Sequence, residues 1–350
     1  KWVGLSYSEQ YDQLYADDSW SYANIPKKAL PKPSPFKQKT AEGATPVPLS
    51  QEVFGTVKTF LFKARKWDLK DYSYAAVIVG MHLGCLLAPM TASWKMFGLF
   101  MASYFATGCL GITLSYHRNL SHKSFALPKW LEYTLAYCGA QAWQGDPMEW
   151  VSTHRYHHLH CETPLDPHTI YEGFWWSHIG WLMDWKVTER RTGDQTNAKE
   201  MQDQPFYTHM QKHYSWHVAG SLALLFALGG LPALVWGGCV RICWVWHVTW
   251  FVNSASHVWG NQDFATGDHS RNNWWVGLLA FGEGWHNNHH AFDFSARHGL
   301  RAKQFDMTWI IVRALQYLGL ATKVRLPTEK AMQRLAVDPS NPVPLRTGFF

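Results

Sequence analysis

The segment His154-Arg-Tyr-His157-His158 decides how this chain folds. An α-helix turns once per 3.6 residues, so side chains at positions i, i+3 and i+4 share one face. The three histidines of this segment can therefore point in one direction. The spacing returns in His286-Asn-Asn-His289-His290, and Asn253-Ser-Ala-Ser-His257 offers a further pair four residues apart. These repeats predict helices that bring imidazoles to a common site.

A third cluster, His117-Arg-Asn-Leu-Ser-His122, has a different spacing. Residues five apart on an ideal α-helix point about 140° away from each other. If both histidines serve the same site, the helix must end or distort within this segment. We therefore expect an irregular helix at residues 117–122.

Clustered imidazoles indicate a metal site, because imidazole suits iron, zinc and copper. Magnesium and calcium would need carboxylates, which the clusters themselves lack. The other histidines, in apolar or mixed segments, more often belong to packed or helix-capping positions with a hydrogen-bond partner. We assign that ordinary role to His82, His178, His209, His213, His217, His247 and His269.

Composition and hydropathy predict a membrane protein. Of the 350 residues, 47% are apolar and 21 are Trp, a residue that concentrates at membrane interfaces. The negative mean hydropathy does not exclude this class, because long polar segments dilute the apolar ones. Stretches that approach the 20 or so apolar residues needed to cross a bilayer lie at residues 74–90, 96–116, 216–236 and 240–259.

The four spans predict two hairpins, with turns at Pro89 to Lys95 and at Gly237-Gly238. Both termini and all histidine clusters then lie on one side, where most basic residues also fall. The expected fold is an all-α membrane protein with four transmembrane helices and a same-side helical cap that holds the metal centre. Residues 1–70 are expected to be an extended, Pro-rich arm, 71–320 the membrane domain, and 321–350 a C-terminal tail.

Several function classes find no support in the sequence. There is no nucleic-acid motif, no glycine-rich phosphate loop and no Gly-x-Ser-x-Gly elbow. The six cysteines form no C-x-x-C pair, which argues against a disulfide framework or a zinc ribbon. A His-Pro-Gly-Gly haem motif and an iron–sulfur cysteine cluster are also missing, so any electrons must come from an external donor.

Two histidine-ligated metals at a membrane surface point to oxidation chemistry. Taking hydrogen from an unactivated methylene group requires an oxidant that side chains cannot supply and that a metal with dioxygen can. Iron is the economical choice. Soluble di-iron bundles use carboxylates with a Glu-x-x-His repeat, which the clusters do not contain, so this site would be a histidine-rich version.

At these residues the sequence resembles the membrane-bound fatty acyl desaturases, in the stearoyl-CoA-desaturase-like delta-9 branch. Within that branch it is most similar to plant and algal plastid enzymes of the palmitoyl-galactolipid delta-7 desaturase type. The resemblance runs from about residue 76 to about residue 318. It includes the three clusters, Gly145-Asp-Pro-Met-Glu-Trp-Val-Ser-Thr, Asp166-Pro-His, Ser177-His-Ile-Gly-Trp and Gly282-Glu-Gly-Trp.

The resemblance implies a di-iron centre and names its residues. The implied ligands are His117, His122, His154, His157, His158, His257, His286, His289 and His290, with Asn253 acting through a water. It also implies a kinked acyl tunnel beside the metals, lined by Gln144, Trp150, Thr249 and Trp250. A kink would place one chosen C–C bond next to the oxidant and favour a cis double bond.

Departures from the acyl-CoA members bear on the substrate. Positions where those enzymes carry basic residues for the CoA phosphates hold Ser152, Tyr171-Glu172 and Trp185 here. Losing guanidinium groups that match phosphates weakens CoA binding. The resemblance thus implies a palmitoyl chain on a plastid galactolipid, in a thylakoid or envelope membrane with the histidines facing the stroma. Ferredoxin would be the donor in a plastid, and cytochrome b5 elsewhere.

Other functions stay open at this point. The chain could be an acyl-CoA delta-9 desaturase, or a hydroxylase that inserts oxygen with the same histidine clusters. It could be a haem-binding membrane cytochrome with His82 and His247 as axial ligands. It could also be a non-catalytic, desaturase-like subunit of a larger membrane complex. Intact ligand positions favour chemistry over the last of these.

Overall fold

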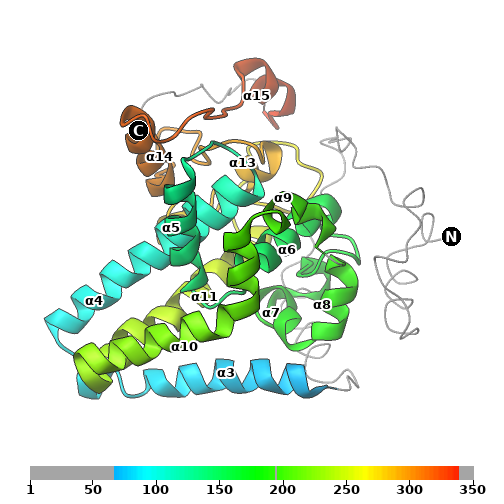
Figure 1. The fold of residues 1–350 in the computed structure, drawn as a ribbon. Helices are drawn as coiled ribbons and strands as arrows, with labels where there is room; N and C mark the ends of the chain where they lie inside the picture. The colour runs from blue at the N-terminus through cyan, green and yellow to red at the C-terminus, as the bar shows by residue number, and fades with distance from the viewer. Residues whose placement is uncertain (1–66, 194, 339–350) are drawn as a thin grey trace.

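The computed structural model describes residues 67–193 and 195–338. Every regular element in these ranges is helical (Figure 1), and extended segments meet only as isolated bridges. This confirms the all-helical expectation. The N-terminal arm expected at residues 1–70 lies almost entirely outside the described residues.

Two long apolar helical stretches organise the fold. Trp94–Ser121 and Pro205–His257 are each long and apolar enough to cross a membrane. The first joins α4 to the π-helix η3, and the second contains α10, η7 and α11. A shorter apolar helix, α3, precedes them (Figure 1). Their bounds are α3 Leu69–Cys85, α4 Trp94–Tyr104, η3 Phe105–Ser121, α10 Pro205–Ala233, η7 Leu234–Val240 and α11 Arg241–Asn253.

The irregular helix expected at residues 117–122 is confirmed. In η3 the backbone winds as a π-helix, whose hydrogen bonds join residues five apart. The N–H of His122 accordingly donates to the carbonyl of His117 at 3.2 Å, and the helix ends there. The wider turn brings side chains five apart onto one face, so His117 and His122 lie with ring centroids 4.9 Å apart.

The second hairpin turns earlier than expected. The backbone of Gly230 leaves helical geometry at φ 62° and ψ −159°, and the chain reverses there instead of at Gly237-Gly238. Gly237 then packs against Leu225 on the returning chain. Hydropathy could not locate this turn, because Gly229 to Pro232 interrupt the helix without adding a polar side chain.

The helix α3 packs against η7 and α11, with no comparable packing against α4. Ile78 and Met81 of α3 belong to the same buried cluster as Ile242 and Trp246. Asp68 starts the helix by accepting hydrogen bonds from the N–H groups of Lys70 and Asp71. The first pair of apolar helices is therefore separated, and the second pair lies between α3 and α4.

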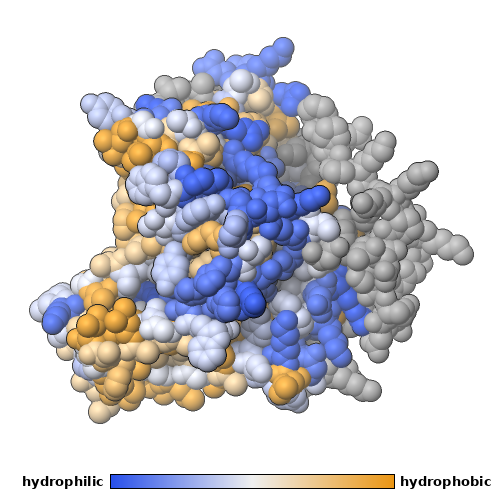
Figure 2. Space-filling view, in the orientation of Figure 1, coloured by the Kyte–Doolittle hydropathy of each residue, from blue (hydrophilic) through white to orange (hydrophobic). Residues whose placement is uncertain are grey.

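Shorter helices gather beyond one end of the apolar ones (Figure 1). They are α5 Lys129–Ala140, α6 Pro147–His160, α7 Phe174–His178, α8 Trp185–Thr192, α9 Lys199–Gln202, α12 Trp274–Leu279, α13 His286–Ala291, α14 Met307–Tyr317 and α15 Glu329–Leu335. Figure 2 shows hydrophobic surface over the outer ends of α3, α4 and α10, and hydrophilic surface over α6, α8 and α9.

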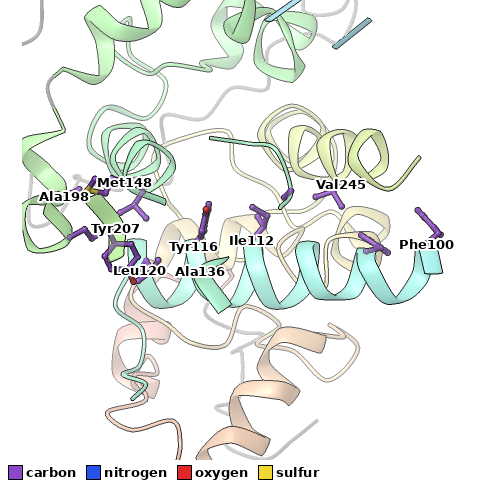
Figure 3. Close-up of a cluster of buried hydrophobic side chains, with 13 residues drawn as sticks. Phe100, Ile112, Tyr116, Leu120, Ala136, Met148, Ala198, Tyr207 and Val245 are labelled. Carbon is purple, nitrogen blue, oxygen red and sulfur yellow. The ribbon is translucent and has the colours of Figure 1, made fainter. Parts of the chain in front are cut away.

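A buried hydrophobic cluster joins the two parts of the molecule (Figure 3). Phe100, Ile112 and Tyr116 come from the α4–η3 helix, and Val245 comes from α11. On the other side Ala136, Met148 and Tyr207 come from α5, α6 and the first turn of α10. Each large apolar side chain buried in this way contributes about 1.5–3 kcal/mol, so the histidine-bearing helices are held firmly against the apolar ones.

The segment expected as a C-terminal tail is folded onto the domain as far as residue 338. Thr322 bridges to Ala126, and Met332 of α15 is buried beside Phe264, Phe292 and Leu300.

Candidate metal centre and cavity

The nine histidines singled out by spacing lie together in the interior as two groups. In each group, one side-chain nitrogen from every member lies within 4.8 Å of the others. The first histidine group is His117, His122, His154, His158 and His289, and the second histidine group is His157, His257, His286 and His290.

The first histidine group is assembled from three parts of the chain. The Nε2 atoms of His122 and His154 are 2.8 Å apart. The Nε2 atom of His289 lies 3.1 Å from that of His117 and 3.0 Å from that of His158. The end of η3, one face of α6 and the helix α13 therefore aim the same ring nitrogen at a common point.

The second histidine group draws on the next positions of the same helices. His157 lies on α6 next to His158, with ring centroids 5.3 Å apart, while His286 and His290 lie on α13. His257 ends the short 3-10 turn after α11, with its Nε2 atom 3.0 Å from that of His286. The histidine clusters on α6 and α13 are thus each divided between two adjacent sites.

These nitrogen–nitrogen distances are those of neighbouring ligands on a metal ion. Histidine nitrogens bind zinc at about 2.0–2.1 Å, so two of them at right angles lie about 3 Å apart. The Nε2 pairs lie 2.8–3.1 Å apart. The donor set of imidazoles alone also fits iron, zinc or copper.

Burial keeps five of these imidazoles neutral. It lowers the pKa of His122, His154 and His158 well below the ordinary histidine value, and neighbouring histidines lower it further. The pKa values of His286 and His289 are lowered for the same two reasons. Each ring therefore offers a lone pair at neutral pH, which is the form that binds metals.

Buried carboxylates bind the outer nitrogens of four of these histidines. Glu283 accepts from Nδ1 of His117 at 2.6 Å, and the other three contacts are 2.9–3.1 Å long. A proton held on Nδ1 leaves the lone pair on Nε2, facing the group. The other pairs are His157 with Asp166, His257 with Glu162, and His290 with Asp268.

Glu283 is itself held by a buried cation. Arg118 donates to it at 2.8 and 2.9 Å and also binds Asp306. Although burial alone raises the pKa of a carboxyl group, Arg118 and the adjacent histidines lower the pKa of Glu283 well below its usual range. Glu283 is therefore a permanent anion beside the first histidine group.

A cavity connects both histidine groups with the apolar helices. At one end it is lined by His117, His154, His157 and His286, together with Asn253 and Glu283. Its remaining walls are mostly apolar and come from the end of α4, from η3 and α11, and from the loop after α12. They include Tyr104, Gly108, Ile112, Val245, Val248, Ala280 and Phe281.

Of the four residues expected along an acyl tunnel, two line the cavity and two lie outside its lining. Trp150 and Thr249 line the cavity. Gln144 lies outside its lining and bridges them, donating to Thr249 Oγ1 at 2.9 Å and accepting from Trp150 Nε1 at 3.2 Å. Trp250 is buried elsewhere, stacked on Trp246 with ring centroids 5.6 Å apart.

The remaining histidines divide into an interior row and a surface set. His247 contacts His82 through Nε2 at 2.9 Å and His178 through Nδ1 at 3.0 Å, so the expected packed role is confirmed for these three. It is wrong for His209, which lies exposed on α10 with its Nε2 atom 3.2 Å from that of His217.

The contact between His82 and His247 also contradicts the haem alternative. Axial nitrogens on opposite sides of one iron lie about 4 Å apart, twice a metal–imidazole distance of about 2 Å. The two nitrogens are only 2.9 Å apart and face each other directly.

The sequence gives no signal for the role of the carboxylates Glu162, Asp166, Asp268 and Glu283, nor for that of His168 and His298, which are buried beside two of them. For His269 the expected packed role with a hydrogen-bond partner is confirmed, and that partner is Glu162. Spacing gives no signal for such contacts, because the partners come from distant segments of the chain.

Comparison with known proteins is consistent with this arrangement. A family model described as fatty acid desaturase matches residues 62–317. Over 272 residues the chain is 55% identical to the chloroplastic palmitoyl-monogalactosyldiacylglycerol delta-7 desaturase of Arabidopsis thaliana, covering 78% of this chain and 73% of that one.

Two further relatives carry different substrate names. An acyl-CoA C20 Delta5-desaturase of Anemone leveillei is 50% identical over 265 residues, or 76% of this chain and 85% of that one. Delta-9 acyl-lipid desaturase 1 of Arabidopsis thaliana is 46% identical over 273 residues, or 78% and 91%.

Proposed function

The chain belongs to the fatty acid desaturase family, and from this premise we propose that it forms a cis double bond in the palmitoyl chain of a plastid galactolipid. Its relatives make it an enzyme that desaturates fatty acyl chains of lipids. The observation that carries the finer proposal is the cavity, whose apolar walls lead to both histidine groups.

Two iron ions are the proposed cofactors, one for each histidine group, with Asn253 acting through a water. The donor set supports this assignment, because neutral imidazoles converge at ligand spacing and carboxylates fix their tautomers. Iron held by these histidines would supply, with dioxygen, an oxidant strong enough for an unactivated methylene group.

The protein's own part is to place and shield the acyl chain. The walls from Ile112 to Phe281 exclude water, and the hydrogen-bonded row of Trp150, Gln144 and Thr249 forms a rigid corner at the histidine end. We assign the kink of the tunnel to this corner. Gln144 holds Trp150 and Thr249 by hydrogen bonds from outside the cavity, and Trp250 packs with Trp246 of the same helix against α3.

The reaction needs a second source of electrons. The acyl chain gives up two hydrogens with two electrons, an external donor gives two more electrons, and two protons are taken up as dioxygen becomes two waters. We propose ferredoxin as this donor, because the relatives at 55% and 50% identity carry chloroplastic names.

A surface pocket beside the first histidine group supports an acidic donor. It is lined by Asn119 and Leu120, which lie between His117 and His122, and by exposed cations. Two of these cations, Lys123 and Lys129, are paired with Glu200 and Glu132, and the other two are Lys323 and Arg325. Arg191 is unsuited to this role, because it is buried in an ion pair with Glu172.

The residues that replace CoA-binding cations support a neutral headgroup. Ser152 is buried and donates to Asn197 at 2.6 Å, so it faces the protein interior. Glu172 is occupied by Arg191, and Trp185 lies between Tyr74 and the ammonium group of Lys70. None of these side chains offers a guanidinium fork to a phosphate.

A membrane placement follows from the same proposal. The apolar surface over α3, α4 and α10 would lie in the bilayer as four spans, with the shorter helices as a cap on one side (Figure 2). The histidine groups would then face the stroma, in a thylakoid or envelope membrane. We propose that the membrane domain begins near residue 71, as the sequence predicts, and that its cap continues past residue 320 through α15.

An acyl-CoA substrate is the second candidate, because a relative at 50% identity is an acyl-CoA desaturase. One experiment separates the candidates. Purified full-length protein in liposomes receives reduced ferredoxin and dioxygen with either palmitoyl galactolipid or palmitoyl-CoA, and products are located by mass spectrometry.

We expect a cis double bond in the galactolipid alone, and no product from His289→Ala. Product from palmitoyl-CoA alone would replace the substrate assignment, and hydroxylated chains would replace the reaction. Bound iron without any product from either substrate would favour a non-catalytic subunit of a membrane complex.

A further inference from the structure

Three histidines outside the metal groups lie beside a carboxylate that also contacts a histidine inside them. For His168 the distance to Asp166 is 3.7 Å, whereas His298 and His269 approach their carboxylates to 2.9 Å or less. The first of these two is His298, whose Nδ1 atom lies 2.9 Å from Oε2 of Glu283. The same oxygen accepts from Nδ1 of His117 at 2.6 Å. Glu283 therefore lies between one imidazole of the first histidine group and one imidazole behind it.

The second histidine group has a matching arrangement. Glu162 accepts from Nδ1 of His257 at 3.1 Å through Oε1, and from Nδ1 of His269 at 2.6 Å through Oε2. The backbone N–H of His269 also donates to Oε1 at 2.6 Å. Each metal site thus has one carboxylate with an imidazole on either side.

Both outer imidazoles are fixed in place. His298 is fully buried, its N–H donates to Asp306 at 2.7 Å, and its carbonyl accepts from Asn288 at 2.8 Å. Among the described residues, neither ring nitrogen of His298 forms a hydrogen bond of normal geometry, and Nδ1 makes the only close polar contact of the ring, with Oε2 of Glu283. The ring therefore acts on the site through Nδ1 and Glu283.

The carboxylate of Glu162, beside the second histidine group, belongs to a residue with an unfavourable backbone conformation. Its φ of 59° lies in the left-handed region that non-glycine residues rarely adopt. Such a conformation persists only where surrounding contacts hold it. The contacts present here are those of its side chain with His257 and His269 and the hydrogen bond that its backbone N–H donates to Asp166 at 2.9 Å.

We propose that His298 and His269 are positioning residues, one for each metal site. Each orients the carboxylate that fixes the tautomer and ring angle of a ligand, His117 through Glu283 and His257 through Glu162. The inference rests on the proposed two-metal centre. Removing partners of this kind lowers metal affinity by about 10–100-fold.

The test measures metal binding directly. Purified full-length protein is stripped of metal and titrated with Co²⁺, whose absorption spectrum reports both stoichiometry and ligand geometry. Wild type should bind two equivalents. His298→Leu should weaken one site by about 10–100-fold and alter its spectrum, and His269→Leu should do the same to the other site.

Matched variants separate positioning from folding. Gln can reach the carboxylate with its amide, so His298→Gln and His269→Gln should restore near-normal binding. Asn is too short, so His298→Asn tests the same idea if Leu prevents folding. His82→Leu removes a hydrogen-bonded histidine that contacts no carboxylate, and should leave both sites unchanged.

Two outcomes are distinguishable. If wild type binds two equivalents and the Leu and Asn variants bind them with unchanged affinity and spectrum, the positioning role is wrong. If wild type binds no Co²⁺ at these sites, the proposed metal centre itself fails.

Discussion

Replacing Glu283 with Gln tests how the first histidine group is organised. The carboxylate accepts from His117 and His298 through one oxygen and from Arg118 through the other. An amide has the same shape but no charge, and its NH₂ group must face either the imidazoles or the guanidinium as a donor against donors. The substitution therefore disturbs His117 or leaves Arg118 partly unpaired.

The loss of folding stability in Glu283→Gln depends on the contacts that Arg118 retains. Breaking a buried ion pair by removing one partner costs about 3–5 kcal/mol. Arg118 keeps its bonds to Asp306 at 2.9 and 3.0 Å, so we expect the lower end, about 3 kcal/mol. For a domain of this size that loss lowers Tm by about 6–12 °C. Metal affinity at the first histidine group should fall by about 10–100-fold.

The assay combines thermal unfolding of the metal-free protein with Co²⁺ titration. Glu132→Gln is the matched control, because Glu132 is a buried carboxylate that binds Tyr207 and Lys129 and no histidine. The control should lose stability without losing metal affinity. Wild-type metal affinity and Tm in Glu283→Gln would refute the reasoning.

Three further predictions address the cavity, the histidines and the donor surface. Phe281 packs on Tyr104 at the apolar end of the cavity, with ring centroids 4.7 Å apart. Phe281→Ala should therefore deepen the cavity and shift the product from palmitoyl toward stearoyl lipids. An unchanged chain-length preference, measured by mass spectrometry, would contradict this. Burial lowers the pKa of His168 to about 3 and that of His298 to about 4 in the folded chain, whereas unfolded histidine titrates near 6.5. The unfolded chain therefore binds more protons below about pH 6.5, and Tm of the metal-free protein should fall between pH 7 and pH 5, whereas a constant Tm would argue against buried neutral imidazoles. Lys323→Glu should raise the KM for ferredoxin at low salt without changing the amount of bound iron. Lys186→Glu on α8 is the control and should leave this KM unchanged. The reverse pattern would place the donor at α8.

Much of the site was predictable because helical spacing reports which side chains share a face. The clusters on α6 and α13 follow this rule, and the spacing of His117 and His122 correctly required a distorted helix. Spacing could not divide the histidines between two sites, since that depends on how separate helices face each other. Nor could it pair Glu283 with Arg118, whose contact spans 165 residues.

The fold was less predictable where polarity gives no signal. Gly230 reverses the chain inside an apolar stretch, so hydropathy placed the turn several residues late. The packing of α3 against η7 depends on shape, as in the contact of Ile78 and Met81 with Ile242, and the pattern of apolar residues alone does not specify a partner.

Iron content of the purified protein tests the central claim most directly. We expect two iron ions per wild-type chain, and a loss from each of His289→Ala and His286→Ala, which remove a nitrogen from the first and the second histidine group respectively. Wild-type protein that holds a single iron under saturating conditions, or variants that retain both ions, would contradict the two-site centre.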